Sequence, residues 1–175
     1  IKALDGAAAK EDYETLALQA SADVLRAYAL ERYDPTYPGQ ESLGHVTVAI
    51  LAREGEPDVT LINLVRDYLD RRDYAGARVH VKGPQFVDVD VTVTIAVEPG
   101  YVAASVASAV QQAIAAWLDP ATWPWGRDVY LSNLQAVIES VDGVDYVVAL
   151  DAPTATVEVP PDGLARAGTI TVTTA

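Results

Sequence analysis

The chain has 175 residues, 50% of them hydrophobic, and a formal net charge of −13. A chain of this length buries one sizeable core or two small ones, and no segment is apolar enough to span a bilayer. The acidic balance argues against a nucleic-acid-binding surface, which needs clustered Lys and Arg side chains to displace counterions from phosphates. The absence of Cys excludes disulfides, thiolate metal sites and cysteine nucleophiles.

The first predicted elements lie within residues 11–32, a segment without Gly or Pro. Its Ala-rich composition favours one long helix by propensity. The hydrophobic pattern divides it instead, because the first half fits a helix while the second half alternates as in a strand. We place the break at 21–23 and expect a strand over 25–32. A loop at 34–39, reading DPTYPG, follows.

A strand, a turn, a helix and a second strand come next. Apolar residues alternate over 46–50, and a Gly-Glu-Pro sequence at 55–57 predicts a turn. The apolar stripe within 61–69 has helical spacing. Residues 78–81 then read as another strand.

A Gly-Pro pair at 83–84 is the best boundary in the chain. It divides the sequence into two small modules, residues 1–84 and 85–175. The alternative is that 79–97 run on as one strand at a sheet edge. The fold class predicted is α+β, with each mixed α/β module consisting of a short sheet and one or two helices packed on one face. A weak internal repeat of the strand–turn–helix unit is expected.

The second module begins with the clearest strand of the chain, residues 86–97. Its apolar side chains occupy alternate positions, with mainly Asp and Thr between them, which indicates one buried and one solvated face. A Glu-Pro-Gly turn at 98–100 ends this strand. Apolar residues then recur at helical spacing up to Leu118, so the pattern predicts a helix that packs on the buried face.

Residues 123–148 combine a chain breaker, a helix and a strand, reading WPWGRDVYLSNLQAVIESVDGVDYVV. Ser132 and Gln135 have the spacing of a capping box, which predicts a helix that starts near Asn133. An Asp-Gly pair ends this helix, and residues 144–150 read as a buried strand.

Two further strands are expected at 154–159 and 169–174, on either side of a Pro-Pro-Asp-Gly turn. The helical stripes of the second module have no other extended apolar face nearby. We therefore expect Trp117, Leu134 and Ile138 to lie in one core beside the strand that opens the module.

No constellation of residues in the sequence indicates catalysis or a metal site. The 25 Asp and Glu residues are widely spread, and none interrupts an apolar stripe that would form a pocket and raise a carboxyl pKa. His45 and His80 lie in or beside predicted strands, and neither has a second ligand at metal spacing. Nucleotide-binding and hydrolase motifs are absent. The sequence therefore predicts no catalytic residue, no cofactor and no metal ligand.

Trp123, Trp125 and Tyr130 are the candidate interface residues. Aromatic side chains beside a Pro-Gly turn can anchor a partner as hot spots. They can equally fill the core of a small module. We expect partial burial of Trp125 and Tyr130, and we regard Trp123 as the better interface candidate.

Several short motifs occur in a fixed order along nearly the whole chain. They are Lys-Glu-Asp-Tyr at 10–13, Gly-His-Val-Thr-Val at 44–48, the strand, turn and helix of 87–118, the pairs Trp125-Gly126 and Val129-Tyr130, and the segment 141–144. In order and spacing together, these motifs resemble the C-terminal part of the baseplate J-like family. Its members are the wedge proteins of contractile phage tails and related injection machines.

The resemblance implies a non-enzymatic structural subunit of a baseplate, in a virion tail or an injection particle and assembled in the bacterial or archaeal cytoplasm. Family members pair with copies of themselves and with a second wedge protein around the spike, and they take part in triggering sheath contraction. The implied partners are therefore wedge subunits, without a cofactor, nucleic acid, membrane anchor or small-molecule substrate. Because the chain starts at Ile1 and contains no Met, we expect family residues to be missing before it.

Two other classes of function remain as alternatives. A small-molecule-binding dimeric regulatory domain is one, since paired α/β modules of this size often dimerise around a ligand at a sheet edge. The sequence lacks the Gly-rich turn after a strand that such a site would use. A carboxylate hydrolase is the other, and it lacks the apolar pocket described above.

Overall fold

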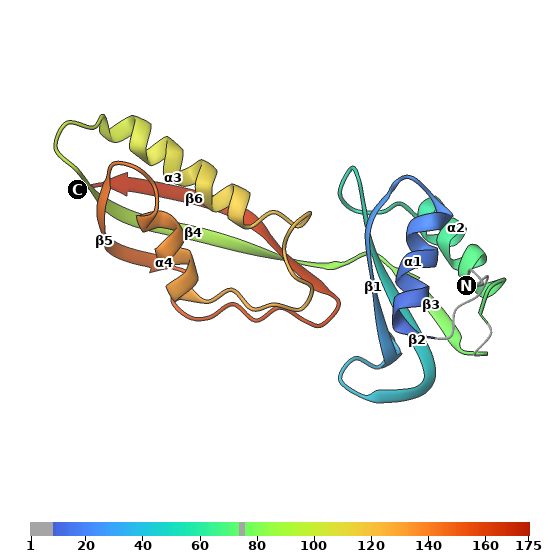
Figure 1. The fold of residues 1–175 in the computed structure, drawn as a ribbon. Coiled ribbons are helices and arrows are strands. Elements are labelled where there is room, and N and C mark those ends of the chain that lie inside the picture. The colour runs from blue at the N-terminus through green and yellow to red at the C-terminus, as the bar shows by residue number, and fades with distance from the viewer. Residues whose placement is uncertain (1–8, 74–75) are drawn as a thin grey trace. The chain divides into compact units, whose positions relative to one another are not determined.

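The computed structural model describes residues 9–73 and 76–175, and the chain divides into two compact units between Pro84 and Gln85. Each unit has a three-stranded mixed sheet with helices on one face (Figure 1), so the predicted α+β class is confirmed. The expectation about residues before Ile1 lies outside the described residues. Within those residues, no helix combines the length and apolar character that a membrane span requires.

Unit 1 contains five elements in the order helix, strand, strand, helix, strand. They are α1 (Lys10–Ala20), β1 (Val24–Tyr33), β2 (Glu41–Ala52), α2 (Val59–Asp70) and β3 (Arg78–Lys82). β2 is the central strand, and it pairs antiparallel with β1 and parallel with β3. Because a parallel pair needs a crossover connection, α2 provides the link between β2 and β3.

The chain changes direction between α1 and β1, where propensity alone favoured one long helix. Ser21 at the end of α1 is extended, with φ −153° and ψ 144°, and its hydroxyl accepts a hydrogen bond from the Asp23 amide at 3.1 Å. Glu14 of α1 accepts a hydrogen bond from the Ala29 amide at 3.0 Å, so α1 covers part of the edge of β1. The predicted break and strand are confirmed, because pairing with β2 outweighs the Ala-rich propensity.

The core of unit 1 lies between its helices and one face of its sheet. Its buried side chains are Tyr13, Leu16, Ala17, Val24, Ala29, Val46, Val48, Ile50, Val65 and Leu69. Successive residues of a strand point to opposite faces. Along β2, Val46 and Val48 therefore point toward the helices, whereas His45 and Thr47 point to the helix-free face.

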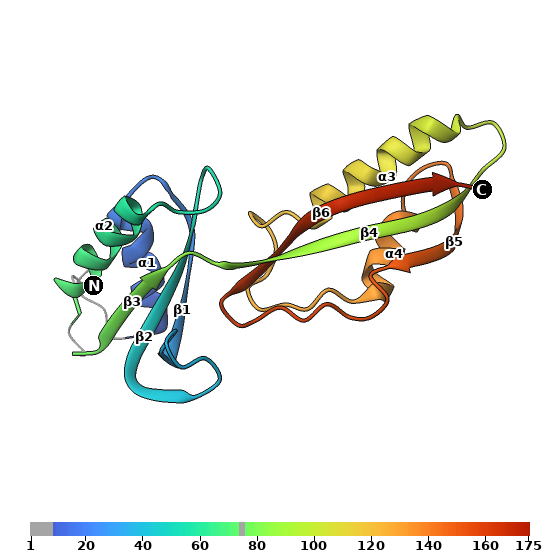
Figure 2. The same ribbon diagram turned by 180° about the vertical axis from the view of Figure 1, so that it is seen from behind.

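Unit 2 contains a strand, two helices and two further strands. They are β4 (Gln85–Val97), α3 (Ala103–Trp117), α4 (Leu131–Glu139), β5 (Val144–Ala152) and β6 (Gly163–Thr174). β4 is central and pairs antiparallel with β5 and parallel with β6. Figure 2 shows the sheet in front, with α3 and α4 behind it on the opposite face.

The predicted alternation of β4 is confirmed. Val89, Val91, Val93 and Ile95 are at most 1% exposed. On the other face of the strand, Asp88 and Asp90 are exposed. The two helices bury apolar stripes, with α3 packed beside β6 and α4 beside β5. These stripes are formed by Val106, Val110 and Ile114 of α3 and by Leu134 and Ile138 of α4. Trp117, the third residue expected in this core, is half-buried at the end of α3.

The start of α4 differs from the prediction. The helix begins at Leu131, with Tyr130 as its N-cap residue and no side-chain cap. Ser132 lies inside the helix and is exposed, and the Gln135 amide donates a hydrogen bond to Glu139 at 3.1 Å. The predicted capping box is therefore wrong. The Ser-x-x-Gln spacing also occurs inside a helix, where the Gln side chain finds a partner one turn further on.

The strand over 144–150 was expected to be buried, and this expectation is wrong. Val144 is buried, but Tyr146 and Val148 are 53% and 46% exposed. Among the strands of the described residues, β5 pairs with β4 alone and lies at an edge of its sheet. Its apolar run therefore marks an exposed edge rather than a strand covered on both faces.

The strand predicted at 154–159 is also wrong. Within this segment, the described pairing is an isolated antiparallel bridge between Val129 and Val157. The strand expected at 169–174 is present as part of β6, which begins earlier, at Gly163. The Pro-Pro-Asp-Gly turn thus leads into a single long strand instead of joining two short ones.

Candidate functional site

Trp123 lies inside unit 2, with 3% of its surface exposed. Its ring packs edge-on against Trp117, with ring centroids 5.0 Å apart and ring planes at 85°. Its indole N–H donates a hydrogen bond to the Arg127 carbonyl at 3.0 Å. An indole that is buried and hydrogen-bonded in this way is part of the core. The preference for Trp123 as the interface candidate is therefore wrong.

Tyr130 is the exposed member of the three aromatic residues. It is 46% exposed, while Trp125 is half-buried and the intervening Val129 is fully buried. As the N-cap residue of α4, Tyr130 has an extended backbone with φ −85° and ψ 133°. Its side chain therefore precedes the apolar stripe of the helix and stays outside the core. Tyr130 is the better candidate for contact with a partner.

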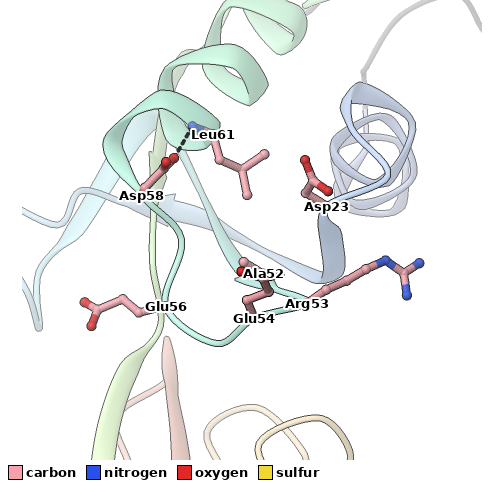
Figure 3. A pocket seen from close by; sticks show the side chains of 7 residues that line it. All are labelled: Asp23, Ala52, Arg53, Glu54, Glu56, Asp58 and Leu61. Atoms are coloured by element: carbon pink, nitrogen blue, oxygen red, sulfur yellow. Dashed lines mark hydrogen bonds between the residues drawn. The ribbon is translucent and has the colours of Figure 1, made fainter.

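A cavity of about 380 Å³ opens in unit 1 beside the start of α2 (Figure 3). Asp23, Ala52, Arg53, Glu54, Glu56, Asp58 and Leu61 line it. The Asp58 carboxylate accepts a hydrogen bond from the Leu61 amide at 2.7 Å and caps α2. The Arg53 guanidinium donates to the Ala22 carbonyl at 2.6 Å. Figure 3 shows the side chains of Arg53 and Glu56 pointing away from one another.

Small-molecule sites are mostly apolar, with a few convergent polar groups. The lining of this cavity is charged, and two of its side chains are engaged in local backbone contacts. The cavity therefore lends no support to the regulatory-domain alternative.

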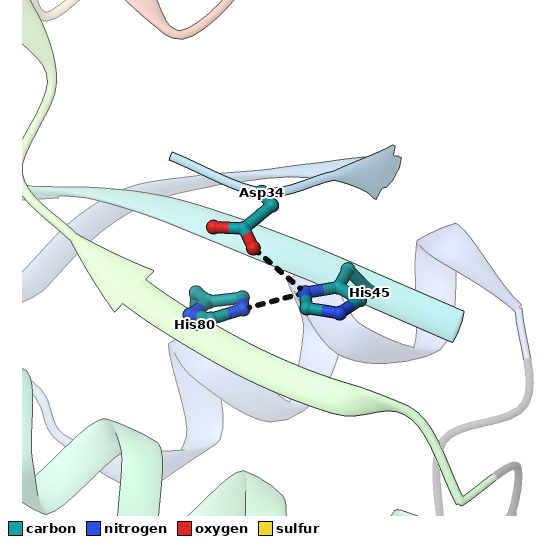
Figure 4. Close-up of side chains that lie close together, drawn as sticks. All are labelled: Asp34, His45 and His80. Carbon is teal, nitrogen blue, oxygen red and sulfur yellow. Dashed lines mark hydrogen bonds and ion pairs between the residues drawn. The ribbon is translucent and has the colours of Figure 1, made fainter. Parts of the chain in front are cut away.

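A second polar cluster of unit 1 consists of Asp34, His45 and His80 (Figure 4). His45 lies on β2, His80 lies on β3, and Asp34 directly follows β1. Thr47 is the partner of His80 in the parallel β2–β3 pair, so both histidines lie on the helix-free face. His45 Nδ1 is 3.0 Å from His80 Nε2 and 3.3 Å from Asp34 Oδ2. The two rings stack with centroids 5.2 Å apart and planes at 15°.

The loop that follows β1 holds the Asp34 side chain in place. This side chain is 10% exposed, and its Oδ1 atom accepts a hydrogen bond from the Thr36 amide at 2.8 Å. That backbone hydrogen bond lowers the pKa of the Asp34 carboxyl, and the nearby histidines lower it further. Asp34 is therefore a carboxylate at neutral pH.

Sequence analysis missed this cluster because its members are far apart in the chain. His45 and His80 are separated by 35 positions. The available signal was the alternation of both strands, combined with a helix between them that allows parallel pairing. The sequence does not fix the register, and register decides whether the two rings meet.

Two consecutive α+β units, with exposed aromatic side chains and open sheet edges, define a modular protein suited to contacts with other proteins. Two family models match it in succession. The Baseplate J-like central domain matches residues 5–83, and the Baseplate J-like protein C-terminal domain matches residues 89–173. The chain belongs to the baseplate J-like family, as the motifs indicated. The family gives the class of function, a structural role in a baseplate.

A solved structure extends the comparison to the fold. The cryo-EM structure of the anti-feeding prophage (AFP) baseplate, 6-fold symmetrised, contains a chain that is 15% identical to this one, with a TM-score of 0.67. The match covers 93% of this chain and 38% of that chain, so this chain spans well under half the length of its structural relative. At this identity the likeness concerns the fold alone. No curated protein matches the sequence.

Proposed function

We propose that the chain is part of a baseplate wedge protein, which assembles with copies of itself and with a second wedge protein around the spike. In this role it takes part in triggering sheath contraction and has no enzymatic activity. The observation that carries the proposal is the succession of a central and a C-terminal baseplate J-like domain along one chain. The fold likeness to a chain of the AFP baseplate supports it.

The proposed location is the tail baseplate of a phage or the baseplate of an injection particle, assembled in the bacterial or archaeal cytoplasm. Assembly there depends on repeated protein contacts. Such contacts use buried aromatic anchors at the centre of an interface and polar groups at its rim. The features of unit 2 that fit this requirement are its edge strands and its exposed aromatic side chains.

The edge strands β5 and β6 differ in how they are protected. An edge strand presents unpaired N–H and C=O groups to which another chain can add. On β6, the Gln111 side chain of α3 donates a hydrogen bond to the Ile170 carbonyl at 3.4 Å. On β5, Tyr146 and Val148 are 53% and 46% exposed. We propose β5, with Tyr130 at the start of the preceding helix, as the contact surface of unit 2.

Reconstitution with neighbouring baseplate proteins tests the proposal. Full-length protein is mixed with the baseplate proteins encoded beside it, and the products are examined by analytical ultracentrifugation and negative-stain microscopy. The expected result is a specific complex that buries on the order of 2,000 Å² or more per interface, the range of permanent assemblies. A protein that stays strictly monomeric with these partners and instead turns over a small molecule contradicts the proposal.

Tyr130 and Tyr37 provide a matched pair of substitutions, because they are 46% and 58% exposed and lie in different units. We expect Tyr130→Ala to weaken the complex by about 2 kcal/mol, the loss typical of a hot spot. Its free energy of unfolding should change by less than about 0.5 kcal/mol, as for other surface changes. Tyr37→Ala should leave both quantities unchanged. If Tyr130→Ala bound its partners with wild-type affinity, Tyr130 would not be an anchor of the interface. The wedge proposal would be unaffected, because it is tested by whether the complex forms at all.

A further inference from the structure

We propose that Asp34, His45 and His80 bind one divalent transition-metal ion of the zinc class. The three side chains each offer one ligand atom, and these atoms all lie within 4.8 Å of one another. Two imidazoles and one carboxylate are a common ligand set for Zn²⁺ in sites that keep a fourth position for water. The proposal concerns unit 1 by itself and does not depend on the baseplate role.

Two of the three distances between the ligand atoms are close to those around a four-coordinate ion. A metal–nitrogen distance of about 2.0 to 2.1 Å implies tetrahedral edges of about 3.3 Å between ligand atoms. The His45 Nδ1 to Asp34 Oδ2 distance is 3.3 Å, and the His45 Nδ1 to His80 Nε2 distance is 3.0 Å. Of the three edges, the first has the required length and the second needs to widen by a few tenths of an ångström, while the third, between His80 and Asp34, is no longer than 4.8 Å.

Hydrogen bonding alone does not satisfy the three atoms together. His45 Nδ1 faces both His80 Nε2 and Asp34 Oδ2. If His45 Nδ1 carries a proton, this single N–H faces two acceptors, His80 Nε2 and Asp34 Oδ2. If it carries no proton, its lone pair faces the lone pairs of the Asp34 carboxylate oxygen. A cation placed between the three atoms interacts favourably with every lone pair. A bound cation would therefore account for the convergence of the three atoms on one point.

The surroundings hold the ligands in position. The side chains of His45 and Asp34 are 19% and 10% exposed, so the site is shielded but reachable from solvent. The Thr36 amide donates a hydrogen bond to Asp34 Oδ1, which leaves Oδ2 to act as the ligand atom. A fixed outer partner of this kind is a regular feature of metal sites. The bound ion would link the loop after β1 to the parallel β2–β3 pair.

Titration of the complete chain with Zn²⁺ tests the site. Isothermal titration calorimetry at neutral pH should give one ion per chain, and Zn²⁺ should raise Tm because it binds the folded state. Replacement of Zn²⁺ by Co²⁺ should give the visible spectrum of a four-coordinate site. In the wild-type protein, Zn²⁺ should shift the ring ¹⁵N resonances of His45 Nδ1 and His80 Nε2, and this measurement needs no variant.

His80→Gln and Asp34→Asn should each weaken Zn²⁺ binding by at least about 10- to 100-fold, the loss seen when even an outer-shell partner is removed. Glu56→Gln is the matched control, because it removes one carboxylate from the acidic cavity of the same unit and should leave affinity unchanged. Absence of saturable binding up to about 1 mM Zn²⁺, a very weak affinity, would overturn the proposal. Unshifted histidine resonances, or wild-type affinity in His80→Gln, would also overturn it and leave a hydrogen-bonded cluster only.

Discussion

Unit 1 and unit 2 both place a long central strand between an antiparallel and a parallel neighbour, but they form the parallel pair differently. In unit 1, β3 follows β2 through the single helix α2 and pairs with it only from His45 to Ala49. In unit 2, β6 comes after two helices and β5, and it pairs with β4 from Gln85 to Ile95. The two units share the strand–helix starts β2–α2 and β4–α3 and then diverge.

The helix-free faces of the two sheets also differ, in how their polar side chains are arranged. In unit 2, exposed cross-strand pairs follow the long β4–β6 ladder, with Thr94 and Thr173 hydroxyls 2.8 Å apart and Asp88 paired with Arg166. In unit 1, polar groups from three segments converge at one shielded point. Alternating polar residues therefore form a solvated face in unit 2, where the paired strands are exposed. In unit 1 they form a candidate site, because the loop after β1 adds a side chain to those of two paired strands.

Substitution of the core gives the largest expected effect. Ile138 and Leu69 are both 0% exposed and lie on α4 and α2 respectively. We expect Ile138→Ala and Leu69→Ala each to lower the free energy of unfolding by about 2 to 5 kcal/mol. Urea denaturation gives the magnitude, and amide exchange assigns each loss to its unit. The exposed Gln135→Ala in α4 is the control, and a loss from Ile138→Ala as small as that of the control would remove Ile138 from the core.

The next largest effect is expected from Gly→Ala substitutions at glycines with positive φ, which should cost more stability in unit 2 than in unit 1. A Cβ at Gly143, where φ is +90°, would lie 2.6 Å from Tyr101 Cδ1 and 2.9 Å from Val106 Cγ2, whereas Gly44, at φ +74°, has nothing within 4 Å. Gly44→Ala should cost about 1 to 2 kcal/mol, from the left-handed backbone alone. Gly143→Ala should cost about 1 to 3 kcal/mol more, because of overpacking. Equal losses in thermal unfolding would show that Tyr101 moves aside freely.

Helix caps provide a smaller contrast. Asp58 caps α2 of unit 1 through its bond to the Leu61 amide, whereas Ser132 lies inside α4 of unit 2 without a capping role. Asp58→Ala should lower the free energy of unfolding by about 1 kcal/mol. Ser132→Ala should change it by less than about 0.5 kcal/mol. A larger loss from Ser132→Ala than from Asp58→Ala in urea denaturation would restore the capping box that the sequence indicated.

The smallest expected effect is a dependence of stability on pH, which concerns unit 1 and appears only above neutral pH. Burial raises the pKa of Tyr13 in unit 1 above its usual range, and the hydrogen bond from its hydroxyl to Asp73, at 2.6 Å, raises it further. The folded state therefore keeps the Tyr13 proton where the unfolded state loses it. This stabilisation is complete below the unfolded pKa of about 10 and is lost as the pH rises toward the folded pKa.

Urea midpoints measured from neutral pH into the alkaline range test this pH dependence. Tyr13→Phe should remove part of the alkaline decline in stability, because Phe has no proton to lose. Tyr37→Phe is the control, since Tyr37 is 58% exposed. An identical alkaline decline in wild type and Tyr13→Phe would contradict the assignment.

Local patterns predicted most of the fold from the sequence. The alternation of β4, the break after α1 and the stripes of α3 and α4 depend on which face of one element is apolar, and that information is present within a single window. Resemblance helped where pattern and propensity disagreed, between α1 and β1. The errors at β5 and 154–159 concern neighbours in the sheet. An apolar run reads the same whether its strand is central, at an edge or unpaired.

The candidate sites were harder to predict for a related reason. Trp123 and Tyr130 belong to the same short run, yet one is 3% and the other 46% exposed, because packing against Trp117 selects only the first. The Asp34, His45 and His80 cluster requires the register of β2 with β3 and the path of the loop after β1. Both are tertiary properties, which composition and spacing within one element do not contain.

During synthesis, β4 leaves the ribosome long before its parallel partner, β6. Asp88 and Arg166, neighbours across the β4–β6 ladder, are 78 residues apart. At 5 to 20 residues per second, β4 waits about 4 to 16 s for β6 to be made. Throughout that interval β4 lacks the partner that pairs with its parallel edge in the folded unit. The nascent chain thus passes through a stage in which β4 lacks its parallel partner, and pairing with β6 ends that stage for unit 2.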